Sequence, residues 1–274
     1  MKSHKICITA MVLFSSLFSA SLSADTVNSS THREHDFDNN SIVPFLEDQG
    51  FTGSAISGEG MSFTNSSTGG LRLKLTWKES EYDGSRRERG HELKANVVDD
   101  KEIFTGFHWR IPSGQSNNIL NKNTIIWQLY CWNSAGCSNW TAHVELKSND
   151  DLYLNYRAAC VSSTEVKIYD NVSTNTDHAF QIRARASGQG NGRIDFKRNG
   201  SFEHQETNIS FGFGSWSNDE MADAVIGVKM GMYCFDTSNY SNNEVRILYL
   251  DNLGSCVRTG SVGNSYNLID PRNY

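Results

Sequence analysis

The stretch AVIGVKMGMYCF, residues 224–235, alternates apolar side chains with small, polar or charged ones. A period of two is typical of a strand, because successive side chains in a strand point to opposite faces of the sheet. Lys229, Gly231 and Tyr233 therefore share one face, and the apolar residues between them share the other. The stretch predicts a strand that lies on a core and presents a polar face.

Similar short runs, rich in β-branched and aromatic residues, recur from about Val43 to the end of the chain. They are GLRLKLTW (70–77), IFTGFHWRI (103–111), TIIWQLYCW (124–132), WTAHVELK (140–147), DLYLNYRA (151–158), EVKIYD (165–170), HAFQIRARA (178–186), GRIDFKRNG (192–200) and EVRILYLDN (244–252). Only SNDEMADAV (217–225) offers a turn or two of helix. Many strands without alternating helices predict an all-β fold with little helix, a single concanavalin-like β-sandwich or jelly roll of two antiparallel sheets.

The first 41 residues differ from the rest of the chain. Residues 1–24 resemble a secretory signal, because Lys2 and Lys5 precede an apolar stretch that ends in small residues. The alternative is a membrane anchor, but serines interrupt the stretch and it falls short of the ~20 apolar residues of a span. Residues 25–41 are polar and aperiodic, which predicts a flexible leader before one domain at 42–274. We expect a secreted protein, extracellular or periplasmic, without membrane contact once the signal is removed.

The charge balance narrows the choice of partners. The chain has 25 basic and 31 acidic residues, a formal net charge of -6. Loss of residues 1–24 removes two lysines and no acidic residue, which makes the charge -8. Nucleic-acid binding depends on clustered Lys and Arg that neutralise phosphates, so we expect no nucleic-acid partner. A hydrophobic content of 38% suffices for one large core, and we expect a monomer.

Five cysteines follow the signal, so at least one has no partner within the chain. Two bridges are compatible with their positions, Cys131 with Cys137 across a turn and Cys234 with Cys256 between late strands, and the sequence does not fix the connectivity. It contains neither a CxxC pair nor an HExxH motif, so we predict no metal site and no required cofactor. A structural calcium ion at a sandwich edge stays open, although no run has a calcium-loop pattern.

Familiar hydrolase signatures are absent from the sequence. A retaining glycosidase uses two carboxylates about 5 Å apart, and no E-x-D-x-x-E run supplies them on one strand. The serine hydrolase motif G-x-S-x-G is also missing. These absences argue against hydrolysis by either route.

Three strands carry polar residues on one face, and these are the candidate site residues. They are Arg87, Arg89 and His91 in SRRERGHELK (85–94), Gln128 and Tyr130 in TIIWQLYCW, and Lys229 and Tyr233 in the opening stretch. Each set also has a structural interpretation. The first suits a solvated convex face, the second a buried hydrogen-bond network, and the third an ordinary amphipathic strand.

From about Phe51 to Leu253 these segments, in this order, resemble the jelly-roll polysaccharide lyases. That superfamily includes alginate lyases, heparin lyase I-like enzymes and the glucuronan lyases of polysaccharide lyase family 20. The most specific element is the K-x-G-x-Y motif, present as Lys229, Gly231 and Tyr233.

The other elements favour one subgroup. Alginate lyases carry an R-x-E-L-R strand and a Q-I-H strand, whereas this chain has RGHELK and QLY, so Tyr130 replaces the usual His. Glucuronan lyases place a His on the first strand, a Gln on the second and a Tyr on the last. His91, Gln128 and Tyr233 match that arrangement. The resemblance therefore implies a lyase acting on β-1,4-linked glucuronate, with these three residues as the catalytic group.

The implied reaction is β-elimination, which begins by removing the weakly acidic C5 proton of a uronate. Donors from Gln128, with Arg89 or His91, would stabilise the charge that develops on the uronate carboxylate. Tyr233 would act as base and then acid, with His91 as the reserve base. A phenol has an unperturbed pKa of about 10, so it needs nearby cations to hold a useful phenolate fraction.

A basic stripe is expected beside these residues, because the substrate is acidic. Its predicted members are Arg87, Arg89, Lys229, Arg183 and Arg185, with Tyr130 as a further binding residue. Two alternatives remain. One is an alginate or glycosaminoglycan lyase on the same fold. The other is a non-catalytic lectin-like module that stacks sugars on aromatic residues such as Trp109, Trp132 and Trp140.

Overall fold

The structure is a computed structural model of the whole chain. It describes residues 27–28, 32–38, 40, 46–49, 60–66, 69–85, 88–95, 102–114, 117–133, 139–158, 162–212, 216–217, 220–221 and 224–273. The predicted signal peptide lies outside these residues. Within them, no helix has the length and apolarity needed to cross a membrane.

One of the two main sheets has nine antiparallel strands in the order β1-β2-β18-β7-β12-β13-β14, with β5 paired to β18 and β4 to β5. The bounds are β1 Val27–Asn28, β2 His32–His35, β4 Met61–Asn65, β5 Leu71–Lys78, β7 Glu102–Arg110, β12 His178–Arg185, β13 Ser187–Arg198, β14 Ser201–Phe211 and β18 Val245–Val257. Strand β18 is long enough to pair with β5 through its first half and with β2 through its second half.

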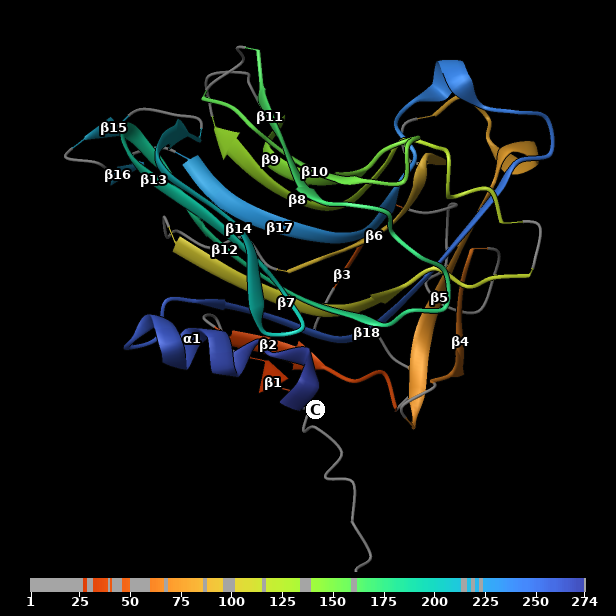
Figure 1. Cartoon of the computed structure of the whole chain (residues 1–274), viewed down its shortest axis with the longest axis horizontal. Helices are drawn as coiled ribbons and strands as arrows, with labels where there is room; N and C mark the ends of the chain where they lie inside the picture. The colour runs from red at the N-terminus through yellow and green to blue at the C-terminus, as the bar shows by residue number, and fades with distance from the viewer. Residues whose placement is uncertain are drawn as a thin grey trace, which may run out of the picture.

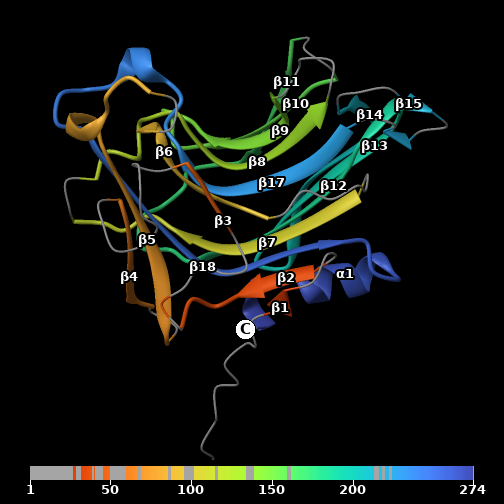
Figure 2. The ribbon, with the colours of Figure 1, turned by 180° about the vertical axis from the view of Figure 1, so that it is seen from behind.

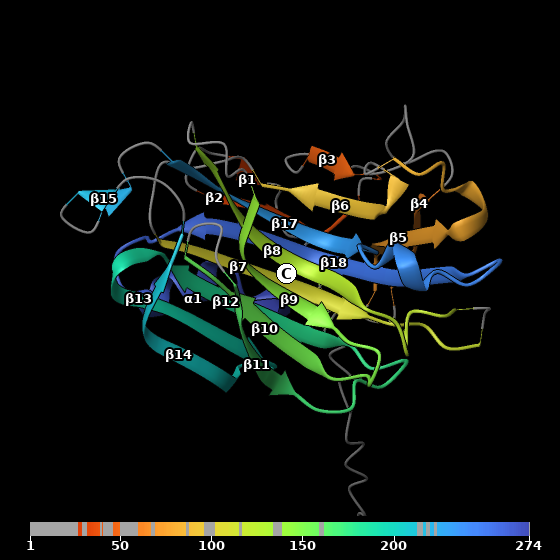
Figure 3. The ribbon, with the colours of Figure 1, turned by 90° about the horizontal axis from the view of Figure 1, so that it is seen from above.

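The second main sheet has seven antiparallel strands in the order β11-β10-β9-β8-β17-β6-β3. The bounds are β3 Leu46–Gln49, β6 Gly90–Lys94, β8 Thr124–Asn133, β9 Asn139–Leu146, β10 Leu152–Tyr156, β11 Thr164–Tyr169 and β17 Ala224–Tyr233. Figure 3 shows these strands side by side, seen from above. In Figure 1 the sheet lies over the nine-stranded sheet, and β8 and β17 bend so that the outer face is the inside of the curve.

The core lies between the two sheets and is formed by the apolar residues of each alternating strand. Leu73 and Leu75 of β5, Phe180 of β12 and Met230 of β17 are among its fully buried members. The prediction of one β-sandwich made of two antiparallel sheets is confirmed.

The remaining elements are short. They are the β15–β16 pair (Trp216–Ser217 and Glu220–Met221), the 3-10 turns η1 (Glu79–Glu81), η3 (Thr237–Asn239) and η4 (Pro271–Asn273), and the helix α1 (Val262–Leu268). The Ser261 side chain caps α1 by accepting a hydrogen bond from the Asn264 amide. Figure 2 shows α1 against the outer side of the nine-stranded sheet, beside β1 and β2.

Three expectations about local structure are corrected. The leader contains strands, because β2 pairs with β18 and Phe37 is completely buried in the core. The described residues of 217–225 belong to strands rather than to a helix. Cys234 and Cys256 are both free and buried, so the bridge between them does not form. The proposed partner Cys137 lies outside the described residues.

Candidate active site

The polar face of β17 is the starting point of the candidate site. Met230 and Met232 belong to the core, and alternation directs Lys229, Gly231 and Tyr233 to the outer face of the seven-stranded sheet. This is the arrangement predicted from the opening stretch. The outer face is also the concave side of the bend in Figure 1.

Gln128 of β8 joins this face, because it lies directly opposite Lys229 in the register of β8 and β17. Its amide nitrogen donates a hydrogen bond to the carboxylate of Glu92 on β6. The Lys229 Nζ atom lies 3.9 Å from the other oxygen of that carboxylate. Glu92 and Gln128 are only 1% and 3% exposed. Gln128 is therefore held in an ordered network formed by three adjacent strands.

Tyr130 projects from the same face of β8, opposite Gly227. A Cβ atom on Gly227 would lie 2.2 Å from the Tyr130 ring, so the glycine provides the space in which the ring rests. The Lys229 Nζ atom is 5.0 Å from the ring centroid, within the range of a cation–π contact. The predicted grouping of Gln128, Tyr130, Lys229 and Tyr233 on one face is found.

Arg89 stands at the Tyr233 end of the site, just before β6. Its Nε atom donates to the Tyr82 hydroxyl at 3.3 Å. That hydrogen bond, followed by the interaction with the Tyr233 hydroxyl, raises the pKa of Arg89 above its ordinary value. A guanidinium therefore lies beside the Tyr233 phenol. It is the kind of group that stabilises a phenolate.

His91 does not join these residues, contrary to the sequence prediction. It points into the space between the sheets, where its Nε2 atom lies 3.0 Å from the carbonyl oxygen of Thr76 on β5. Gly60 packs so closely that an added Cβ would be 2.1 Å from the imidazole. Burial lowers the pKa of His91 to about 4. The residue is a neutral core histidine that cannot touch a ligand on the outer face.

His143 of β9 provides an imidazole that the sequence analysis missed. It is directly opposite Gln128 in the register of β8 and β9, and it projects to the same outer face. Its Nε2 atom lies 3.4 Å from the Glu145 carboxylate. Burial lowers the pKa of His143, so the ring is neutral at neutral pH. The sequence feature that could have identified His143 is the alternation in TAHVEL (141–146), in which Thr141, His143 and Glu145 alternate with three apolar residues.

Arg157 and Trp140 extend the outer face beyond His143. The Arg157 guanidinium carbon lies 3.8 Å from the centroid of the Trp140 ring, and that ring contacts His143 edge-on, with centroids 4.2 Å apart. The two other tryptophans considered as sugar platforms are not comparable. Trp109 is fully buried in the core, and the side chain of Trp132 lies outside the described residues.

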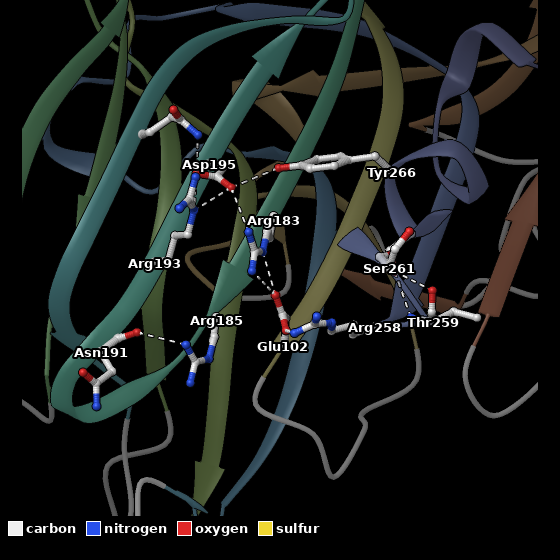
Figure 4. A network of polar contacts seen from close by, with 12 residues as sticks. Glu102, Arg183, Arg185, Asn191, Arg193, Asp195, Arg258, Thr259, Ser261 and Tyr266 are labelled. Carbon is white, nitrogen blue, oxygen red and sulfur yellow. Dashed lines mark hydrogen bonds and ion pairs between the residues drawn. The ribbon is translucent and has the colours of Figure 1, made fainter. Parts of the chain in front are cut away.

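The prediction of a basic stripe is wrong for two residues. Arg183 and Arg185 belong to β12 of the other sheet and project from its outer side, as Figure 4 shows. There Arg183 pairs with Glu102 at 2.6 Å and with Asp195 at 3.4 Å. Arg185 donates to the carbonyl of Asn191 at 3.5 Å. The Tyr266 hydroxyl of α1 also donates to Asp195 at 3.2 Å, so Arg183 belongs to a structural network on the other sheet from Lys229. Arg87 lies outside the described residues.

The outer face contains no obvious metal centre within the part of the chain that the structure describes. No group of three or more His, Cys, Asp or Glu side chains there is arranged to hold an ion. What the face offers is a phenol next to a guanidinium, an amide next to an ammonium group, and a neutral imidazole. This set can donate hydrogen bonds to an anionic group and exchange a proton with it.

Comparison with known proteins links this fold to polysaccharide lyases. No protein-family model and no curated protein sequence matches the chain. Among solved structures, the endo-β-1,4-glucuronan lyase from the fungus Trichoderma reesei is similar with a TM-score of 0.59 and 17% identity, over 82% of this chain and 98% of that one. The PL-14 alginate lyase from Aplysia kurodai follows with a TM-score of 0.53 and 10% identity, over 73% and 88% of the two chains.

A third similar structure is named without reference to lyase activity. The cellulose-induced protein Cip1 has a TM-score of 0.51 and 12% identity, over 83% of this chain and 99% of that one. The structural neighbours confirm the predicted β-jelly-roll fold. At these sequence identities the neighbours establish the fold alone. The activity of this chain has to be argued from its own residues.

Proposed function

We propose that the protein is a polysaccharide lyase that cleaves a uronate-containing polymer by β-elimination at the outer face of the seven-stranded sheet. One observation carries the proposal. Tyr233, Gln128 and Lys229 share that face, in a fold whose solved neighbours include glucuronan and alginate lyases. The signal-like start of the chain is consistent with an enzyme that is secreted to meet its polymer.

In this proposal, Gln128 and Lys229 bind the carboxylate of the uronate. Removal of the C5 proton places negative charge on the carboxylate, and donors aimed at that charge lower the barrier as an oxyanion hole does. The ammonium of Lys229 supplies a charge-assisted hydrogen bond, which is about twice as strong as a neutral one. The Gln128 amide nitrogen donates one hydrogen bond to the Glu92 carboxylate, which fixes the position of the amide. Gln128 thus keeps one orientation, and the second hydrogen of its amide nitrogen remains a donor for substrate.

Tyr233 is the proposed base and acid. As phenolate, beside the guanidinium of Arg89, it takes the C5 proton. The electrons of the C5–H bond form the C4–C5 double bond, and the C4–O glycosidic bond breaks. The phenol then gives the same proton to the departing oxygen. In a 4-linked β-glucuronate the C5 hydrogen and the leaving oxygen are on one ring face, so a single tyrosine can serve both steps.

His143 replaces His91 in the proposed mechanism. It faces the same side as Gln128, and its lowered pKa keeps a nitrogen lone pair available at neutral pH. In that state it either accepts a proton or hydrogen-bonds a sugar hydroxyl. Neither role needs a metal ion or other cofactor.

A substrate panel tests the proposal. The purified protein is incubated with glucuronan, alginate, heparin and ulvan, and the ultraviolet absorbance of the unsaturated uronate product is followed. We expect the largest rate with glucuronan, because Tyr130 stands where alginate lyases carry His. A faster rate with alginate or a glycosaminoglycan would keep the reaction and change the substrate. No increase with any polymer would refute the lyase proposal.

The alternative function is sugar binding without turnover. The stacked Arg157 and Trp140 pair favours it, because aromatic and guanidinium planes form a platform for acidic sugars. Binding of a polymer without formation of unsaturated product would select this alternative.

A further inference from the structure

Three aromatic side chains pack together near Arg89, at the Tyr233 end of the candidate active site. They are Trp77 of β5, Tyr82 directly after η1 and Tyr240 directly after η3. The ring centroids of Tyr240 and Trp77 are 4.5 Å apart, and those of Tyr240 and Tyr82 are 5.3 Å apart with the two planes at 84°. Edge-to-face contact is a favourable arrangement of two aromatic rings. Packing therefore holds the Tyr82 ring in one place.

The backbone of Arg89 is fixed against the end of β17. The Cys234 amide donates to the carbonyl oxygen of Arg89 at 2.6 Å. The next residue, Gly90, is opposite Tyr233 in the register of β6 and β17, and an added Cβ atom would lie 1.9 Å from the Met232 carbonyl oxygen. Only a glycine allows so close an approach. The two strands therefore place Arg89 beside Tyr233.

The backbone does not by itself fix the guanidinium, because an arginine side chain has many rotamers. The Tyr82 hydroxyl restricts it by accepting a hydrogen bond from the Arg89 Nε atom at 3.3 Å. The same guanidinium interacts with the Tyr233 hydroxyl. A guanidinium has several N–H donors, so it can contact both phenols at once. The position of the Tyr82 ring therefore determines how the cation meets Tyr233.

We propose that Tyr82 is a positioning residue, whose hydroxyl holds the guanidinium of Arg89 against the phenol of Tyr233. A cation kept at this distance stabilises the phenolate that takes the C5 proton, whereas a guanidinium free to change rotamer does so only part of the time. Tyr82 itself exchanges no proton and contacts no substrate. The catalytic meaning of this contact rests on the proposed function, and the contact itself does not.

Tyr82→Phe tests the role in catalysis, because it deletes the acceptor and keeps the ring that packs on Tyr240. We expect kcat to fall about ten- to a hundredfold with KM unchanged, since misplacing a group by about an ångström slows the reaction by this order. The rise of kcat with pH should move to higher pH, which a loss of stability alone would not cause. Tyr249→Phe is the matched control. Its ring also lies against an arginine, 4.1 Å from the guanidinium carbon of Arg72, but on the other sheet. It should leave kcat and its pH profile unchanged.

A second measurement needs no substrate. NMR follows the Arg89 Nε–H resonance, assigned by its loss in Arg89→Gln. Tyr233→Phe should shift this resonance when Tyr82 is present, and the shift should disappear when Tyr82→Phe is combined with it. Non-additivity of this kind shows that two residues act through a shared partner. The positioning role is thus decided even if no polymer is cleaved, so its failure is distinguishable from failure of the lyase proposal.

Arg89→Lys is a further variant, which keeps the charge and removes the Nε donor and the planar fork. It should lower kcat as Tyr82→Phe does, and the double variant should be no slower than Arg89→Lys alone. Three outcomes would overturn the proposal. They are wild-type kcat and pH profile in Tyr82→Phe, a rise in KM without a loss of kcat, or an equal effect of Tyr233→Phe on the Arg89 resonance with and without the Tyr82 hydroxyl.

Discussion

The phenol of Tyr233 and the imidazole of His91 project from opposite faces of one sheet, although β17 and β6 are hydrogen-bonded neighbours. His91 is paired with Met232, the residue next to Tyr233, and both point into the core. Gly90 is the residue opposite Tyr233. The proposed catalytic face would therefore take its phenol from β17 and its imidazole from β9.

Tyr233→Phe should remove nearly all turnover and leave binding intact. The substitution deletes only the hydroxyl that takes up and returns the proton, while the ring keeps its place near Phe235. Rates of unsaturated uronate formation and equilibrium binding of the polymer are the two measurements. A variant that keeps more than about a tenth of kcat, a barrier difference of roughly 1.4 kcal/mol, would assign the base to another residue.

His143→Asn and His91→Asn form a matched pair. We expect His143→Asn to lower kcat about 100-fold, a typical loss for a proton-transfer or charge-stabilising group. His91→Asn should leave kcat of the folded protein unchanged and lower the free energy of unfolding by about 1–3 kcal/mol. Enzyme assays and denaturant titrations of both variants check this. A large loss of kcat in His91→Asn, with kcat unchanged in His143→Asn, would instead assign the catalytic imidazole to His91 of β6.

Gly227→Ala should displace the Tyr130 ring, because the new Cβ would lie 2.2 Å from it. Overpacking of this kind costs about 1–3 kcal/mol in unfolding free energy, and we expect KM for the polymer to rise. Gly263→Ala in α1 is the control, since its nearest neighbour would be 3.8 Å away. It should be neutral or slightly stabilising. Equal effects in the two variants would contradict the role given to Gly227.

The pH dependence of stability should report on His91. Its pKa is about 4 in the folded protein and near 6.5 when unfolded, so the unfolded chain binds more protons between these values. The stabilisation from the neutral ring is therefore complete above pH 6.5 and is lost as the pH falls towards 4. It amounts to about 3 kcal/mol. Denaturant titrations of wild type and His91→Gln across this range should show a flatter profile for the variant.

Much of the fold followed from the alternation of side chains. The opening stretch placed Lys229 and Tyr233 together, and TIIWQLYCW placed Gln128 beside Tyr130, because period two assigns faces without knowledge of the partners. Alternation also places His91 and Glu92 on opposite faces of β6. The sequence analysis assigned His91 to the wrong one of these two faces. Leu93 and Ala95 share the side of His91 and are buried, and they marked that side as the core.

Other features depend on which strands pair, and a sequence does not state this. Arg183 and Arg185 alternate as expected, but β12 pairs with β7 and β13 in the nine-stranded sheet, so their charges face the wrong side for the stripe. His143 became a candidate only once β9 was placed beside β8. The strand in the predicted leader was missed because HREH has no apolar residue. Backbone pairing with β18 stabilises it instead.

That pairing affects any shortened form of the protein. Without residues up to Phe37, the second half of β18 would present unsatisfied amide and carbonyl groups along an open border, and a hollow would remain where the phenyl ring fits. Bare strand borders recruit other chains. Trimming at residue 41, which the polar composition invites, would therefore make the protein more prone to self-association.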